Sequence, residues 1–163
     1  MMSLLRTYKL ENPDFEFIHE SKDYFIEKTN EFEKDYVFNN CKNGTLGGFA
    51  FSYPKLNYDL NDDEVLVDVI STGVNYRDIL NLTGEYPGDP DFPGLEFSGR
   101  IVKVGKDVSK FIEGDGVIGL SFGSYSSRLV VNEKMLIHYS GDDLVNAASV
   151  PLANATVYKS FEK

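Results

Sequence analysis

The stretch GVNYRDILNLTGEYPGDPDFPGLEFSG occupies residues 73–99, and its pattern changes along its length. From Asn75 to Leu82 the apolar residues recur at helical spacing, and Gly84 follows where a helix C-cap is expected. Glycine, proline and aspartate come next at turn positions, and PGLEFSG then leads into a new apolar run. The stretch therefore predicts a short helix and a turn between two strands.

The segments on both sides of this stretch have the pattern of short strands. Residues 64–72, EVLVDVIST, are apolar on both faces, which is typical of a central strand. Further strand-like runs, separated by turn residues, are LGGFAFSY, FSGRIVKV, GVIGL, YSSRLVV and MLIHY. Helical patterns follow Asp142 and cover residues 151–161, where Pro151 suits a first helical turn. The sequence therefore predicts a mainly β, barrel-like fold with a few short helices.

Composition limits the function classes. A chain of 163 residues has the length of one domain with a sizeable core. The net charge of −10 and the scattered lysines exclude a nucleic-acid partner, because phosphate contacts need clustered positive charge. Cys41 is the only cysteine, which rules out an intramolecular disulfide and suits a reducing compartment, with the cytoplasm expected by default. The opening MMSLLRTYKLENPD predicts no signal peptide, and no apolar run is long enough to enter a membrane.

Residues 114–119 read GDGVIG and match the G-x-G-x-x-G pattern of dinucleotide-binding loops. In those loops the glycines connect a strand to a helix whose N-terminus faces the pyrophosphate, and an acidic residue follows about 20 positions later. Here the chain continues as LSFGSYSSRLVV, which has a β pattern, and Met135 stands near the acidic position. The segment is therefore predicted to be a β-turn that enters a strand.

The stretch at 73–99 is followed by RIVKVGKDVSKFIEGDGVIG and later by AASVPLANATVYKSF. In this order and spacing the three blocks resemble the zinc-free medium-chain dehydrogenase/reductase superfamily, most closely the enoyl reductase domains of polyketide synthases and animal-type fatty acid synthases. The resemblance begins near Tyr36. It implies a GroES-like, partly open β-barrel at 35–141. Residues 1–34 contain none of these blocks and are interpreted as an upstream linker or extra strands, with one strand predicted from the alternation at 15–20. Residues 142–163 would be a helical connection toward a nucleotide-binding Rossmann domain that the chain does not include.

The resemblance also implies a reaction. In the whole enzyme, NADPH would reduce an α,β-unsaturated acyl thioester delivered by an acyl carrier protein, among the other domains of a synthase. The family's glycine-rich cofactor loop lies on the missing domain, so this chain alone is expected to be inactive. A free-standing quinone or alkenal reductase is a second interpretation, disfavoured because Leu80 stands where quinone reductases carry a tyrosine. A non-catalytic GroES-like docking module is a third.

Site residues follow from the same resemblance. Asn75 and Tyr76, at the start of the helix, and Thr156, on the last helix, are expected beside the nicotinamide and its ribose. Tyr86 matches the tyrosine associated with protonation of the α-carbon, a task that suits a phenol, although it could instead pack on nearby prolines. Arg77 and Asp78 open the same helix, where backbone amides can meet a ligand. The alternative for these two side chains is a local ion pair or helix capping.

Two predictions concern acidic and metal-binding groups. Glu96 lies between apolar residues and could serve acid-base chemistry, but a carboxylate hydrogen-bonded to nearby backbone is favoured. Zinc-dependent relatives carry a histidine where this chain has Leu95, and Cys41 has no partner at ligand spacing. No metal site is therefore predicted, and His19 and His138 are expected to be half-buried strand residues.

Overall fold

The computed structural model describes residues 35–40, 49–52, 58–86 and 93–162. The elements in chain order are β1 (Val37–Asn40), β2 (Phe49–Ser52), β3 (Glu64–Thr72), α1 (Tyr76–Thr83), β4 (Glu96–Val104), β5 (Gly116–Leu120), β6 (Arg128–Asn132), η1 (Glu133–Met135), β7 (Leu136–His138), α2 (Leu144–Ala147) and α3 (Pro151–Phe161). This mainly β composition confirms the predicted fold class. The strand predicted at 15–20 and the rest of 1–34 lie outside the described residues, as does Cys41.

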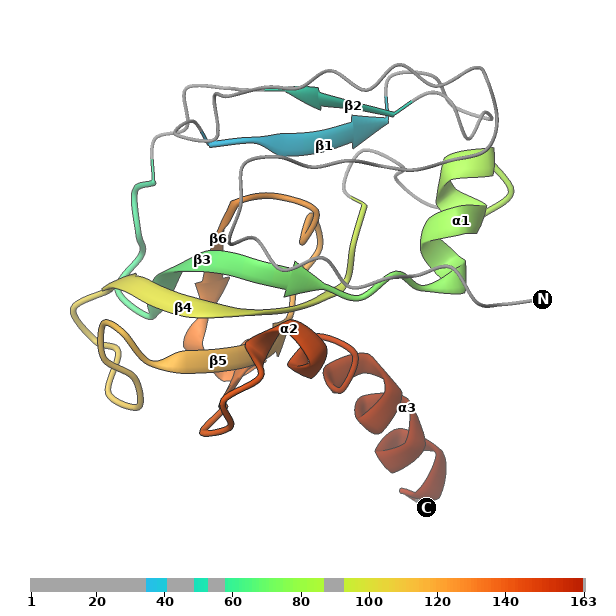
Figure 1. The fold of residues 1–163 in the computed structure, drawn as a ribbon. Coiled ribbons are helices and arrows are strands. Elements are labelled where there is room, and N and C mark those ends of the chain that lie inside the picture. Colours follow the sequence, from blue (N-terminus) through green and yellow to red (C-terminus); the bar gives the residue numbers. More distant parts are fainter. Residues whose placement is uncertain (1–34, 41–48, 53–57, 87–92, 163) are drawn as a thin grey trace. The chain divides into compact units, whose positions relative to one another are not determined.

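Five strands form one open antiparallel sheet in the order β6-β3-β4-β5-β7. Figure 1 shows β3, β4 and β5 side by side in this sheet. β3 pairs with β4 on one side and with β6 on the other, so it is the central strand that the sequence predicts. The register of β3 against β4 shifts between Leu66 and Val67 and again between Val69 and Ser71. Such bulges increase local twist and bend a sheet toward a barrel without closing it.

A second, two-stranded sheet is formed by β1 and β2, which pair antiparallel. The Phe38 amide donates to the Tyr125 carbonyl at 2.8 Å, and Val37 forms a bridge with Ser126. The Ser127 amide donates to the Tyr36 carbonyl at 3.0 Å. These bonds tie the first described strand to the segment before β6.

The core lies where β3, β4, β5 and β6 present their apolar residues to one another. Phe97, Val65 and Val67 are fully buried at its centre. The other buried members are Ile101, Phe111, Val117, Leu129, Val131 and Leu136. Burial of nine such side chains stabilises the sheet on which the loops and helices of the site are mounted.

The helices begin and end close to their predicted positions. α1 ends at Gly84, whose φ of 74° is the left-handed conformation that glycine adopts most easily. α3 covers the predicted residues 151–161, with Pro151 in its first turn. α2 has only four residues, and the Asp143 side chain caps it by accepting from the Asn146 amide at 3.0 Å.

Two predicted strands are shorter than their sequence patterns. In YSSRLVV the strand starts only at Arg128. Ser126 forms a bridge with Val37, and the Ser127 amide donates to the Tyr36 carbonyl while the Ser127 carbonyl accepts from the Val69 amide. In MLIHY the strand starts at Leu136, because the Asn132 side chain accepts from the Lys134 amide at 3.0 Å and caps η1.

GDGVIG forms the turn that the sequence predicts. Gly114 has a φ of 92°, and Gly116 begins β5, which pairs antiparallel with β4 and β7. The segment runs into a strand, so it cannot present a helix N-terminus to a phosphate. The dinucleotide interpretation of this motif is therefore excluded.

Candidate functional site

The start of α1 is fixed by local hydrogen bonds. Asn75 is the N-cap, with extended backbone angles, and its amide donates to the Asp78 carboxylate at 2.9 Å. A carboxylate three residues into a helix that accepts from the cap is half of a capping box. Helix capping, one of the two local alternatives for Arg77 and Asp78, is therefore observed for Asp78. Tyr76, the first helical residue, has a side chain that is 76% exposed.

Glu96 connects α1 to α3. Its Oε1 accepts from the Asn75 side-chain amide at 3.0 Å, and its Oε2 accepts from the Leu152 backbone amide at 2.8 Å. Leu152 lies in the first turn of α3, where backbone amides have no partner within the helix and the helix dipole favours a negative charge. The side chain is only 4% exposed, so both bonds are shielded from water. Glu96 is thus a buried bridge between the two helix starts, close to the favoured interpretation of its sequence pattern.

Gly73 makes room for this bridge. A Cβ at position 73 would lie 2.3 Å from Oε1 of Glu96 and 2.6 Å from its Cγ and Cδ, all closer than atoms can approach. The Glu96 carboxylate is held at both oxygens, so it cannot move aside without losing a hydrogen bond.

Gly73→Ala should therefore destabilise the chain by about 1–3 kcal/mol, the usual range for an overpacked site. Urea unfolding followed by circular dichroism measures this change. The same substitution in a Glu96→Ala background should cost clearly less, because the clashing atoms are gone. Equal costs in the two backgrounds would show that Gly73 does not serve the Glu96 bridge.

Asp78 is a second buried carboxylate, with 1% of its surface exposed. Besides the Asn75 amide, it accepts from the Gly94 amide at 3.2 Å and from the Tyr125 hydroxyl at 3.1 Å. Burial raises the pKa of Tyr125 above its usual 10.0, and the neighbouring Asp78 charge raises it further. Asp78 therefore joins α1 to the loop before β4 and to the loop before β6.

The other predicted site residues are more exposed. Tyr86 lies just after α1, with its ring 38% exposed and stacked on the Arg77 guanidinium, 5.2 Å from the ring centre. The Thr156 hydroxyl donates to the Leu152 carbonyl at 2.8 Å, one turn earlier in α3. The structure thus links Asn75 to the α3 turn through Glu96. Among the described residues, no hydrogen bond joins Tyr86 to Asn75 or Thr156.

Two features of the site have no clear signal in the sequence. The Tyr125 hydroxyl reaches Asp78 from 47 residues away, and Phe122 stacks on Arg77 from the loop after β5. The only hint is the aromatic FGSY segment, whose Phe122 and Tyr125 make these contacts. The predicted ion pair between Arg77 and Asp78 does not form, because the Asp78 carboxylate is occupied by three other donors.

His138 differs from its prediction. It lies in β7 as expected, but its side chain is exposed rather than half-buried. Its Nε2 lies 2.7 Å from the Lys110 carbonyl oxygen, and its ring packs on Phe111 at 4.5 Å. His19 lies outside the described residues.

Neither a metal-binding cluster nor a membrane-spanning helix is present in the part of the chain that the structure describes. Its side chains include no group of three or more His, Cys, Asp or Glu that could hold a metal ion. Zinc-free behaviour stays a prediction: protein purified without chelator should contain no stoichiometric zinc by elemental analysis, and one zinc per chain after dialysis would contradict it. No helix among the described residues has the length and apolarity needed to cross a membrane.

Comparison with known proteins identifies the family. Residues 61–141 match the family described as the Alcohol dehydrogenase GroES-like domain. The chain is 38% identical over 117 residues to an erythronolide synthase of Saccharopolyspora erythraea, which covers 71% of the chain and 3% of that protein. It is 39% identical over 108 residues to probable polyketide synthase 6 of Dictyostelium discoideum, covering 63% of the chain and 4% of the relative.

Solved structures have the same fold. The apo form of the JamJ enoyl reductase superposes with a TM-score of 0.72 at 25% identity, covering 79% of this chain and 42% of that one. The quinone oxidoreductase of Escherichia coli complexed with NADPH gives a TM-score of 0.66 at 26% identity, covering 79% and 40%. The chain spans less than half of each of these structures. With its GroES-like sheet and its polyketide synthase relatives, the chain belongs to the medium-chain dehydrogenase/reductase superfamily, as the N-terminal half of an enoyl-reductase-like domain.

Proposed function

We propose that this chain is the substrate-binding half of an NADPH-dependent enoyl reductase within a polyketide or fatty acid synthase. The observation that carries the proposal is the 38% identity over 117 residues to a polyketide synthase. Leu80, in the position where quinone reductases resembling this chain carry tyrosine, also supports an enoyl thioester as the substrate. The thioester would arrive on an acyl carrier protein, and tethering within one synthase would supply the effective concentration that an acidic surface does not.

The residues at the start of α1 and on α3 suit a position beside the nicotinamide of the cofactor. Asn75 and the exposed Tyr76 ring stand at the positively polarised start of α1, and Glu96 holds the Asn75 amide in place. Glu96 also fixes the first turn of α3, and Thr156 lies further along the same helix. When bound, NADPH supplies a hydride for the β-carbon of the enoyl group. We assign Asn75, Tyr76 and Thr156 to cofactor placement.

Proton delivery is assigned to Tyr86. Addition at the β-carbon moves electron density to the thioester oxygen, and the resulting enolate must take a proton at the α-carbon. A phenol can donate that proton or orient a water that does so. The partly exposed Tyr86 ring, held against Arg77, has access to an incoming substrate.

The remaining residues, 142–163, are proposed as the helical connection to a nucleotide-binding domain. The side chains of Val157, Tyr158 and Phe161 are 56%, 72% and 82% exposed on α3. A helix that exposes this much apolar surface suits contact with further protein. We likewise propose 35–141 as the barrel and 1–34 as an upstream segment.

A substrate comparison tests the proposal against its main competitor, which rests on the likeness to a quinone oxidoreductase structure. The full-length protein that carries this chain is assayed with NADPH, once with a crotonyl thioester and once with a benzoquinone. We expect a higher kcat/KM for the thioester. Preference for the quinone would assign the chain to the quinone reductases, and turnover of neither substrate would favour a docking module.

The chain by itself should bind NADPH weakly or not at all, because its described part contains no glycine-rich strand-to-helix loop for the pyrophosphate. Calorimetric titration of the 163-residue chain measures this. A dissociation constant of about 1 μM or tighter, near −8 kcal/mol, would show that the main cofactor anchor lies within the chain.

A further inference from the structure

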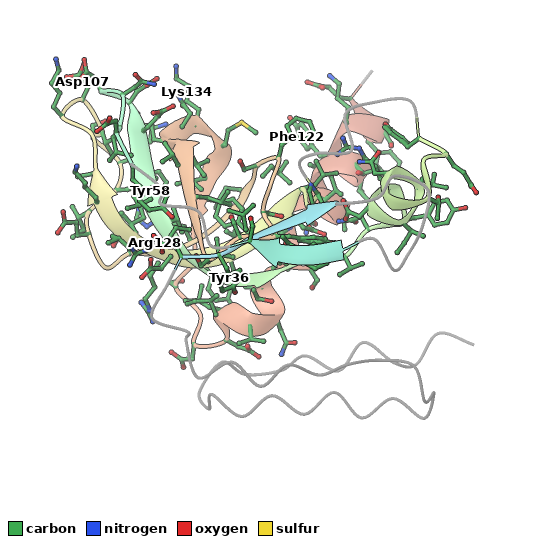
Figure 2. All side chains as sticks on the ribbon, turned by 90° about the horizontal axis from the view of Figure 1, so that it is seen from above. Tyr36, Tyr58, Asp107, Phe122, Arg128 and Lys134 are labelled. Atoms are coloured by element: carbon green, nitrogen blue, oxygen red, sulfur yellow. The ribbon has the colours of Figure 1, made fainter. Side chains whose placement is uncertain are left out.

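Arg77 has an unusual environment for an arginine. Its guanidinium carbon lies 5.0 Å from the centre of the Phe122 ring and 5.2 Å from that of Tyr86. Phe122, labelled in Figure 2, is 64% exposed, and Tyr86 is 38% exposed. Among the described residues, these two rings are the only partners found for the guanidinium, and no carboxylate or carbonyl oxygen is bonded to it. We call these three side chains the Arg77 clamp.

Among the described residues no carboxylate accepts from Arg77, which is unusual because the chain is strongly acidic. It has 26 Asp and Glu against 16 Lys and Arg, and the adjacent residue is itself an aspartate. That aspartate, Asp78, is buried and bonded to three other donors. By contrast, the Arg128 Nε donates to Asp68 at 2.6 Å. Arg77 therefore keeps its hydrogen-bond donors available near the surface.

The shape and charge of the guanidinium favour a particular class of ligand. The group is planar, and its N–H donors point outward from its edge in a fork that fits two oxygens of a phosphate or carboxylate. The guanidinium carbon lies over both aromatic rings, which attract the cation without accepting its N–H hydrogen bonds in the way an oxygen would. The first turn of α1 adds the positive end of the helix dipole, which disfavours an arginine alone but favours a bound anion. The combined field suits an anion with two or more oxygens.

We propose that the Arg77 clamp binds a phosphate ester, namely that of the phosphopantetheine arm that carries the enoyl thioester. This inference rests on the proposed function, which supplies an arm bearing both a phosphate and the reacting acyl group. The pyrophosphate of the dinucleotide has the same chemistry and is the other possible source of the phosphate.

The test compares two substrates that differ only in the phosphate, crotonyl-pantetheine and crotonyl-4′-phosphopantetheine, with the full-length protein. The readout is the ratio of their kcat/KM values, which cancels any general effect on Tyr86. Arg77→Gln should lower this ratio by about 10- to 100-fold, the range expected for a charged hydrogen-bond pair. Arg77→Lys should keep part of the preference, because it retains the charge but loses the fork. Arg100→Gln, which removes an exposed arginine bonded to the Gly114 carbonyl, is the control and should leave the ratio unchanged.

Two other results for Arg77→Gln would lead to different conclusions about the phosphate site. If Arg77→Gln lowers activity on both substrates equally, the clamp only positions Tyr86 and the phosphate site is refuted. If the ratio holds but the KM for NADPH rises about 10- to 100-fold, the phosphate site is supported and belongs to the dinucleotide.

If the wild-type protein reduces neither thioester, the proposed function has failed, and the clamp is judged by calorimetry with 4′-phosphopantetheine and pantetheine. Tighter binding of the phosphorylated compound, lost in Arg77→Gln, would still support the site. Equal binding of the two compounds would refute it.

Discussion

Tyr86→Phe in the full-length protein should change the configuration of the α-carbon when an α-methyl enoyl thioester is reduced. Loss of the phenol removes the group that directs the proton, so protons should arrive from the other face in part or in full. The rate should fall by up to about 10²- to 10⁴-fold, the range for a general acid, with the smaller loss if water takes its place. Chiral chromatography of the product and steady-state kinetics measure the two effects.

Asn75→Ala is the matched control. Its side chain bonds to Glu96 rather than to the Tyr86 region, and its proposed task is to place the nicotinamide. It should slow hydride transfer and leave the configuration unchanged. If Tyr86→Phe keeps both rate and configuration, Tyr86 only packs on Arg77, and the proton comes from elsewhere.

Asp78→Ala should cause the largest loss of stability, about 3–5 kcal/mol. The substitution leaves the amides of Asn75 and Gly94 and the Tyr125 hydroxyl without their acceptor, and each unsatisfied buried donor costs about 1–3 kcal/mol. Removal of a buried charge offsets part of this total. Urea unfolding of the chain measures the free energy. A loss below about 1 kcal/mol would mean that water replaces the carboxylate.

Tyr125→Phe isolates one of these three bonds and should cost about 1 kcal/mol at neutral pH. It also has a pH signature, because the pKa of Tyr125 is raised in the folded chain, mainly by burial. A raised pKa means that the folded state holds the proton more tightly, so this stabilisation is complete below the unfolded value of 10.0 and decreases as the pH rises above it. The wild-type chain should therefore lose more stability above pH 10 than Tyr125→Phe does. Parallel losses would contradict the assignment.

The sequence predicts those features that depend on local pattern. The two apolar faces of residues 64–72 identify the central strand β3, and Pro151 marks the start of α3. Gly84 ends α1 because its left-handed backbone favours glycine. GDGVIG is rejected as a cofactor loop because the residues after it have a strand pattern, and β5 confirms this.

The site is harder to predict because its contacts join segments that are distant in the chain. Glu96 reaches the Leu152 amide across 56 residues, and Tyr125 reaches Asp78 across 47. No periodicity encodes such contacts, since they depend on how the loops between strands fold back on the sheet. Arg77 shows the consequence: its neighbour Asp78 suggests an ion pair, but tertiary donors occupy that carboxylate and the guanidinium stacks on Phe122 instead.

Hydride delivery to the β-carbon of an enoyl thioester is the reaction that we propose for the full-length protein containing this chain. The most direct measurement is a single turnover of crotonyl thioester by the full-length protein with NADPH that carries deuterium at both C4 positions of the nicotinamide. We expect deuterium at the β-carbon of the butyryl product and a solvent proton at the α-carbon. Product without deuterium at the β-carbon, or turnover confined to quinones, would contradict it.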